Sequence, residues 1–354
     1  MQRTVNSNDV TVKEIYTEIT GRKYTLLFTL AALCLLTLTI DILVGPAWLS
    51  VWDVISAIFS IGTVDPTVNA IVWTMRLPIA LMAIVVGATL GIAGAEMQTV
   101  LDNPLASPYT LGVSAAAGFG AALAIVLGVG IAPFMQVYMV PINAFFFSLL
   151  TCILIYVIGK RRKATTETMV LVGIALMFLF QALLSLLQYF ASTETLQQIV
   201  FWLFGSLMRT TWPKLGIVTA FLVVIVPLLV CDAWKLTALK LGDDKARGLG
   251  INVERLKLKT FVLISLLTAV AVCFVGTIGF IGLVGPHIAR MLVGEDQRFF
   301  LPMSALGGAF ILSGASIGSK VIIPGGILPI GIVTSLIGIP FFISLILSKR
   351  RGYW

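Results

Sequence analysis

The chain has 354 residues, of which 58% are hydrophobic and 11% are charged. Soluble domains carry about 25% charged residues, so this composition excludes an ordinary soluble globular protein. Apolar runs close to the length of a membrane span predict a polytopic α-helical membrane protein that contacts lipid. The formal net charge of +8 does not indicate a nucleic-acid partner, because most bases fall in short loops, where they orient membrane helices.

The N-terminal residues 1–23 are polar and mixed in charge, and we expect a cytosolic tail with a short helix near Val10–Ile19. They lack the basic start, short apolar core and cleavage site of a signal peptide. Two bases stand directly before the first apolar run, Tyr24–Val44, so the N-terminus is predicted to be cytosolic. Asp41 lies near the outer end of this run and need not be deeply buried.

Apolar runs follow one another through residues 24–348, which predicts an all-α transmembrane domain of about ten helices. Both ends are then cytosolic, and residues 349–354 form a C-terminal tail. Val200–Leu207 is too short to span and is expected to be an external, partly embedded helix. The predicted spans are Tyr24–Val44, Leu77–Ala95, Thr110–Ile131, Val137–Ile158, Thr168–Phe190, Leu215–Cys231, Thr260–Ile278, Gly279–Val293, Phe299–Ile317 and Ile327–Leu347.

The distribution of bases supports this topology. Of the 24 lysines and arginines, almost all fall on the predicted cytosolic side, as the positive-inside rule requires. The exceptions are Arg76, Arg209, Lys214 and Lys320.

The second predicted span carries a row of small residues and ends in a break. Gly87, Gly91 and Gly94 lie where they would let a neighbouring helix approach closely. The segment that begins with Asn103 and Pro104 and ends with Pro108 breaks the chain on the cytosolic side.

One later span carries a polar stripe. Gln181, Ser185 and Gln188 fall at positions i, i+4 and i+7 of Thr168–Phe190, so they share one helix face. Such a stripe either lines a transport pathway or hydrogen-bonds to a neighbouring helix, and both interpretations stay open.

The four cysteines stand alone in apolar runs, without a CxxC pair. We therefore predict no metal site and no disulfide framework, and expect all four to be small core residues. They are Cys34, Cys152, Cys231 and Cys273.

The longest charged segment, Asp232–Lys259, separates two almost wholly apolar halves. It cannot lie in hydrocarbon, so it must lie in water. Helix formers in Leu236–Leu241, followed by Gly242, Gly248 and Gly250, predict a short helix, a turn and a second short helix. The segment is either an ordinary basic cytosolic loop or a docking surface for a cytosolic motor protein.

Motifs for catalysis are missing from the sequence. It has no phosphate-binding Gly-x4-Gly-Lys-Ser/Thr loop, and hence no ATP site of its own, and no nucleophile elbow or HExxH motif. Glu96, at the inner end of the second span, is the acid nearest to mid-membrane, and the scarcity of such acids argues against an ion-coupled carrier. His287, the only histidine, follows Pro286 in a glycine-rich segment, and a structural role is its default interpretation.

Several ordered motifs resemble the FecCD-type permease subunits of type II ABC importers, which take up ferric siderophores, haem and cobalamin. The resemblance covers roughly residues 24–348 and leaves out the 23-residue head. In the first half the motifs are Arg76-Leu77-Pro78, Gly87…Gly91…Gly94, Met97-Gln98, Asn103-Pro104-Leu105-Ala106-x-Pro108 and Leu111-Gly112-Val113-Ser114. In the second half they are Ala238-Leu239-x-Leu241-Gly242, Ala246-Arg247-x-Leu249-Gly250, Gly279-Phe280-Ile281-Gly282-Leu283-Val284-x-Pro286-His287-x-x-Arg290 and Leu328-Pro329-Ile330-Gly331.

The resemblance implies a type II importer permease fold, with two permease subunits that are identical or paralogous. It implies that two cytosolic ATPase subunits, which carry the ATP and magnesium, dock on the charged loop, and that this chain binds no cofactor and is not itself an enzyme. The residues implied in this coupling are Leu239, Leu241, Gly242, Ala246, Arg247, Leu249 and Gly250. The residues implied in a structural and conformational role are Asn103, Pro104, Gly279, Gly282, Pro286 and His287.

On the outer face, the resemblance implies that an extracytoplasmic binding protein delivers the cargo. Bases at the positions of Arg76 and Lys320 would meet glutamates of that protein, although Ile79 replaces a further base of the family. Alternatively, the two bases only reach lipid headgroups, as bases at span ends commonly do.

Together these observations predict a permease subunit of an ATP-driven importer in the bacterial cytoplasmic (inner) membrane. Its cargo is expected to be an iron chelate, in the first place a ferric siderophore, moved by alternating access along a pathway for which Gln181, Ser185 and Gln188 are candidate linings. Haem, cobalamin or an oxyanion on the same fold are alternatives. An intramembrane enzyme or a secondary carrier is the alternative from another class.

Overall fold

A computed structural model describes residues 12–47, 49–62, 64–128, 138–161 and 166–347. Within these ranges all regular secondary structure is helical, which confirms the predicted all-α class. Residues 1–11 of the predicted N-terminal tail and the whole C-terminal tail, 349–354, lie outside the described residues.

Ten helices of the described ranges correspond to the ten predicted spans. Seven are long and apolar enough to cross a membrane, and the apolar parts of α5, α13 and α15 are shorter. The ten are α1 (Val12–Leu43), α4 (Leu77–Val100), α5 (Val113–Leu127), α6 (Met139–Arg161), α7 (Thr166–Phe190), α9 (Trp212–Val230), α12 (Val253–Val275), α13 (Ile281–Val293), α14 (Gln297–Val321) and α15 (Ile330–Leu347).

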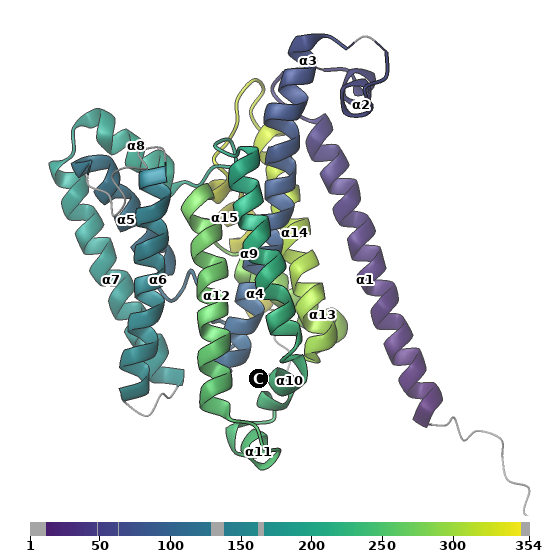
Figure 1. The fold of residues 1–354 in the computed structure, drawn as a ribbon, viewed down its shortest axis with the longest axis vertical. Helices are drawn as coiled ribbons and strands as arrows, with labels where there is room; N and C mark the ends of the chain where they lie inside the picture. The colour runs from purple at the N-terminus through teal and green to yellow at the C-terminus, as the bar shows by residue number, and fades with distance from the viewer. Residues whose placement is uncertain (1–11, 48, 63, 129–137, 162–165, 348–354) are drawn as a thin grey trace, which may run out of the picture.

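Short helices lie at the two ends of this bundle. They are α2 (Val51–Phe59), α3 (Pro66–Ala70), η1 (Ile71–Arg76), α8 (Thr193–Leu203), α10 (Ala233–Leu239) and α11 (Asp243–Gly248). Figure 1 shows α2 and α3 at one end of the molecule and α10 and α11 at the opposite end. We call the end that carries α10 and α11 the inner end, and the end that carries α2 and α3 the outer end.

The bundle is organised around α4, which is buried along most of its length. The predicted glycine row is its contact line with two neighbours: a Cβ on Gly87 would overlap the backbone of Gly308 in α14, and one on Gly94 would overlap Gly282 in α13. Gly91 meets α14 in the same way. Close backbone approach through small residues is how membrane helices gain packing energy without a hydrophobic driving force.

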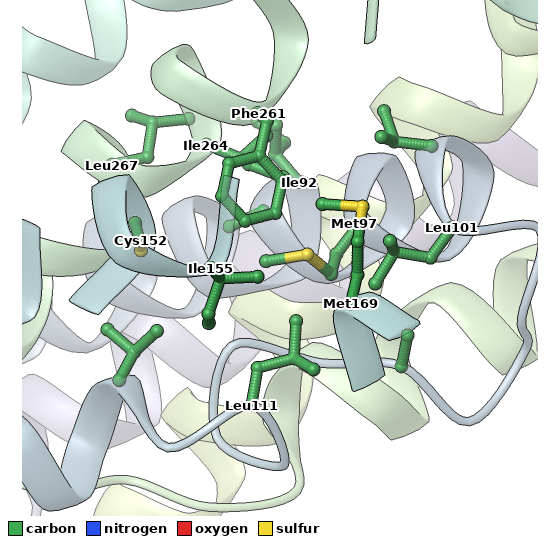
Figure 2. Close-up of a cluster of buried hydrophobic side chains, with 14 of the residues drawn as sticks. Ile92, Met97, Leu101, Leu111, Cys152, Ile155, Met169, Phe261, Ile264 and Leu267 are labelled. Carbon is green, nitrogen blue, oxygen red and sulfur yellow. The ribbon is translucent and has the colours of Figure 1, made fainter. Parts of the chain in front are cut away.

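A second group of helices, α5 to α8, stands beside the group that contains α4, α9 and α12 to α15, while α1 runs along the far edge (Figure 1). An apolar cluster joins the two groups. Met97 of α4, Ile155 of α6, Met169 of α7 and Phe261 of α12 are all buried in it (Figure 2). Deleting any of these side chains would open a cavity at the seam between the groups.

Two predicted boundaries are wrong. Of the helix predicted near Val10–Ile19, Val10 and Thr11 lie outside the described residues, and from Val12 the chain is not a separate helix but part of α1, which runs into the first span. The external helix predicted at Val200–Leu207 begins earlier, at Thr193, where the hydroxyl of Ser192 accepts a hydrogen bond from the Thr195 amide and caps α8. The first half of α8 is polar, so hydropathy did not indicate that the helix begins at Thr193.

The segment Gly279–Val293, predicted as a glycine-broken span, is also different. The break precedes the helix, at residues 276–280, and α13 then runs without interruption through Pro286. Phe280 has a φ of 67°, in the left-handed region that side chains rarely adopt. Its ring packs so closely on Gly338 of α15 that a Cβ there would overlap it.

Three of the four cysteines are buried as predicted, but Cys231 is exposed at the end of α9. Within the described residues, no group of three or more His, Cys, Asp or Glu side chains could hold a metal ion.

Candidate functional site

The charged loop at the inner end forms the predicted pair of short helices, α10 and α11. Gly242 makes the turn between them with a φ of 103°, which a residue with a Cβ adopts only under strain. Asp243 and Asp244 stand in the first turn of α11, where acids complement the helix dipole, and Arg247 stands in its last turn. Gly250 has a φ of 79° and turns the chain toward α12.

The residues implied in coupling divide into two sets. Leu239 and Ala246 are 4% and 0% exposed and belong to the small apolar core that holds α10 and α11 together. Leu241 and Leu249 are 57% and 53% exposed. Two large apolar side chains exposed on a charged loop indicate a contact surface for another protein. The first set makes the loop rigid, and the second is available to a partner.

Charges fix the loop further. Asp232 accepts bonds from Lys235 at 2.7 Å and from Lys259 at 2.5 Å. Burial alone would raise the pKa of Asp232, but the hydrogen bonds from these two lysines outweigh it and hold the pKa below its usual value. Arg247 is paired within the loop, at 3.1 Å from Asp244 and 2.8 Å from Glu254.

The two outer bases do not project from the surface. Arg76 is 5% exposed, and its guanidinium donates hydrogen bonds to the carbonyls of Ile42 (3.1 Å), Leu43 (2.7 Å) and Ala47 (2.6 Å). Ile42 and Leu43 are the last residues of α1, whose carbonyls the helix leaves unpaired, and Ala47 lies in the segment that follows α1. In this structure the Arg76 side chain bonds to carbonyls of its own chain and does not project toward a partner's glutamate or a lipid headgroup.

Lys320 is buried as well, at 9% exposed, and lies 2.7 Å from the carboxylate of Asp41. Asp41 is itself 0% exposed, so the expectation that it need not be deeply buried is also wrong. The hydroxyl of Ser316 donates to both of its carboxylate oxygens at 2.9 Å. The pair joins the outer ends of α1 and α14. Arg209, by contrast, is exposed at the outer end.

The polar stripe on α7 is not covered by this chain. Gln181 and Ser185 are exposed and Gln188 is partly buried. They share this face with Ile174 and Phe178, which are 36% and 62% exposed. An amide facing hydrocarbon is costly. The face therefore indicates contact with another protein or with a polar pathway.

Three non-helical segments, residues 204–211, 276–280 and 322–329, lie between the helices and are bonded to neighbouring backbone. The amide of Ser206 donates to the carbonyl of Val275 at 2.7 Å, and the amide of Gly331 donates to the carbonyl of Phe204 at 2.9 Å. Gly276, with a φ of 77°, fits here only because it has no side chain, since a Cβ would overlap the Trp202 carbonyl. Non-helical backbone among membrane helices is tolerated where protein pairs it or where it lines a cavity.

A pocket of about 310 Å³ opens beside this junction. Among the described residues its lining contains no Asp, Glu, Lys, Arg or His, and its polar groups are backbone, the hydroxyls of Thr277 and Ser335, and Tyr109. None of the three stripe residues of α7 lines it. The lining residues are Tyr109, Leu203, Phe204, Thr277, Gly279, Gly331, Ile332, Ser335, Leu336 and Ile339.

The residues implied in structure and conformation have distinct contacts. The side chain of Asn103 accepts a hydrogen bond from the Leu105 amide at 2.9 Å, and Pro104 stands between them in this turn. Gly279 lines the pocket, and Gly282 makes the contact of α13 with α4 described above.

His287, which follows Pro286 in α13, lies edge-on to the ring of Phe341 in α15, with ring centroids 6.1 Å apart. This contact fits a packing role for the histidine.

Glu96 is the feature that sequence reasoning noted but did not use. It is 0% exposed in α4, and neither carboxylate oxygen has a hydrogen-bond partner among the described residues. One buried carboxyl with no converging base or nucleophile does not make a catalytic site.

The described residues form an all-helical bundle with ten apolar helices, a charged loop at one end and a pocket beside paired non-helical backbone, an arrangement that fits a membrane permease. The chain belongs to the FecCD transport family, whose model matches residues 33–348. This confirms the resemblance drawn from the motifs.

Known proteins agree with this assignment. The chain is 36% identical over 281 residues to the hemin transport system permease protein HmuU of Yersinia pestis, covering 79% of this chain and 84% of that protein. It is 34% identical over 324 residues to the vitamin B12 import system permease protein BtuC of Vibrio cholerae, covering 91% and 94%. A solved structure described as an inward-facing ABC transporter of metal-chelate type aligns with a TM-score of 0.79 and 32% identity, covering 92% of this chain and 99% of that one.

Proposed function

We propose that this chain is the permease subunit of an ATP-driven importer that carries a ferric chelate, in the first place a ferric siderophore, inward by alternating access. The observation that carries the ATP-driven part is the rigid α10–α11 loop with Leu241 and Leu249 exposed on it. A separate cytosolic ATPase, holding its own ATP and magnesium, would seat this loop in a cleft and move it. The chain itself then needs no cofactor.

The cargo is inferred from the pocket. Among the described residues its lining carries no Asp, Glu, Lys, Arg or His, which suits a weakly polar chelate that must be bound loosely and released. An oxyanion such as molybdate would need cationic or amide donors that this lining does not concentrate. Haem and cobalamin, named for relatives of this chain, are alternatives of the same general kind.

A second permease subunit, identical or paralogous, would cover the open face of α7. The exposed Gln181 and Ser185 support this, because neither hydrocarbon nor the chain's own helices satisfy them. The pathway would then run along this face, between the two subunits. The many bases at the inner end support a cytosolic position for that end, in a bacterial cytoplasmic membrane.

A binding protein would dock at the outer end. Because Arg76 and Lys320 are buried there, we assign them to holding the ends of α1 and α14 in place beneath the docking face. Arg209 is the exposed base that a partner's carboxylate could reach. Exposed pairs of this kind orient a partner more than they bind it.

The test is uptake by proteoliposomes that contain the chain with its partner ATPase and binding protein. Ferrichrome, ferric enterobactin, hemin, cobalamin and molybdate are offered in parallel, with and without ATP. We expect ATP-dependent uptake of a ferric siderophore, no hydrolysis by the chain alone, and loss of ATPase docking in the double variant Leu241→Asp/Leu249→Asp. Uptake without any ATPase subunit, or hydrolysis by the chain alone, would refute the assignment; uptake of hemin, cobalamin or molybdate instead would refute the proposed cargo.

A further inference from the structure

The loop that carries α10 is bonded to the membrane helices by side chains whose role is so far unassigned. Thr237 of α10 lies against Gln297, the first residue of α14, and the Gln297 amide donates to the Thr237 hydroxyl at 3.0 Å. The side-chain amide of Gln297 donates to the hydroxyl of Thr99, near the end of α4, at 2.8 Å. One residue of α14 thus joins the short helix to the central helix of the bundle.

Every hydroxyl in this bridge is used twice. The Thr237 hydroxyl also donates to the Ala233 carbonyl at 2.9 Å, and the Thr99 hydroxyl donates to the Ala95 carbonyl at 2.9 Å. Gln297 and Thr99 are only 1% and 2% exposed. Each hydroxyl both donates and accepts, so removing the Thr237 hydroxyl leaves the buried Gln297 amide without this acceptor. The Gln297 Oε1 atom is already buried without a partner among the described residues.

A second connection leaves the same face of α10. Lys240 lies three residues after Thr237, so the two side chains point to the same side of the helix. Lys240 lies 2.7 Å from Asp102, just beyond α4, and 3.6 Å from Glu295, just before α14. Arg290 of α13 lies 2.9 Å from that same glutamate.

We propose that Thr237, Gln297 and Thr99 are positioning residues that transmit the movement of α10 to the inner ends of α4 and α14. This rests on the proposed function, since the movement is the one that the ATPase imposes. Thr237 and Lys240 bond α10 to the bundle, while Trp234, one turn before Thr237, is 62% exposed. Because α10 is bonded to α4 and α14 at the inner end, a displacement of α10 also displaces those two helices. Without these bonds α10 could tilt without moving them.

The first experiment measures coupling in proteoliposomes that contain the complete transporter. Thr237→Val keeps the shape of the side chain and removes both hydrogen bonds. The number of chelate molecules imported per ATP hydrolysed should fall about tenfold, in the range expected for a buried donor left unpaired, while the complex assembles and hydrolyses ATP at its normal rate. Thr237→Ser, which keeps the hydroxyl, should restore coupling.

The matched control is Thr268→Val. Thr268 is a buried threonine of α12, 1% exposed, whose hydroxyl bonds within its own helix, to the Ile264 carbonyl at 2.8 Å. Thr268→Val should leave the coupling ratio within about twofold of wild type, because its hydrogen bond lies inside one helix and joins no other element. The double variant Thr237→Val/Thr99→Val should lose little more than Thr237→Val, because both changes cut the same bridge. If the losses of coupling in the Thr237→Val and Thr99→Val variants add in the double variant, the two residues act independently and the proposal is refuted.

The second experiment needs no cargo and no ATPase. The sample is the isolated chain with Cys231→Ser, which removes the exposed native cysteine. Spin labels at Trp234→Cys and Leu105→Cys then report the distance between α10 and the segment after α4. Wild type should give one narrow distance distribution, and Thr237→Val or Gln297→Asn a broader one. Equal widths would overturn the proposal even if transport of every chelate tested failed. A wild-type complex that neither hydrolyses nor imports would refute the proposed function alone.

Discussion

The buried pair Asp41–Lys320 allows a quantitative test of what holds α1 to the bundle. Lys320→Met removes the cation and leaves Asp41, 0% exposed, with the Ser316 hydroxyl as the one hydrogen-bond donor to its carboxylate in the part of the chain that the structure describes. Asp41→Asn in the same chain then removes the charge that was left behind. The single and the double variant should therefore lower the free energy of unfolding by very different amounts.

The magnitudes follow from burial. Removing one partner of a buried ion pair typically costs ~3–5 kcal/mol, because an uncompensated charge stays inside. Replacing both partners by uncharged groups of similar shape is often nearly neutral. We expect Lys320→Met to lower the free energy of unfolding by ~3–5 kcal/mol and Asp41→Asn/Lys320→Met to lower it by about 1 kcal/mol or less.

The assay is reversible unfolding in mixed micelles of dodecyl maltoside and increasing dodecyl sulfate, followed by helical circular dichroism. Arg247→Met is the matched control, since its pairs with Asp244 and Glu254 are exposed and should be worth ~0–1 kcal/mol. If Lys320→Met costs no more than Arg247→Met, or if the double variant is as unstable as the single one, the reasoning is refuted. Any loss of binding-protein docking in Lys320→Met should appear together with the loss of stability.

Other changes test single positions. Gly276→Ala should abolish transport and destabilise the fold by at least about 1–3 kcal/mol in the same unfolding assay, because φ is 77° and the Cβ meets the Trp202 carbonyl; wild-type stability would contradict this. Glu96→Gln should leave uptake intact and leave stability equal or higher, since an unpaired amide is cheaper to bury than a carboxylate; lost uptake with normal folding would reveal a chemical role. His287→Gln should keep substantial uptake, because its ring packs on Phe341; complete loss of uptake in a well-folded variant, rescued by metal or by pH, would reveal a chemical role instead.

The sequence by itself determined the class, the positions of the spans, the pair of helices in the charged loop and the glycine row of α4. Each of these depends on local properties: a run of apolar residues must lie in lipid, bases stay on one side, and Gly242 turns the chain wherever its neighbours fold. The residues implied in coupling lie in this segment, and their role stays a prediction. Their division into the buried pair Leu239 and Ala246 and the exposed pair Leu241 and Leu249 was not predicted.

Only the tertiary structure decided what the outer bases and the buried polar groups contact. Lys320 meets Asp41, and Gln297 joins Thr237 to Thr99, between residues far apart in the chain. A charged or polar side chain near a span end is compatible with a surface, a lipid headgroup or a buried partner. Which of these is realised depends on the helix that packs beside it, because burial without a partner costs several kcal/mol while burial with one is tolerated.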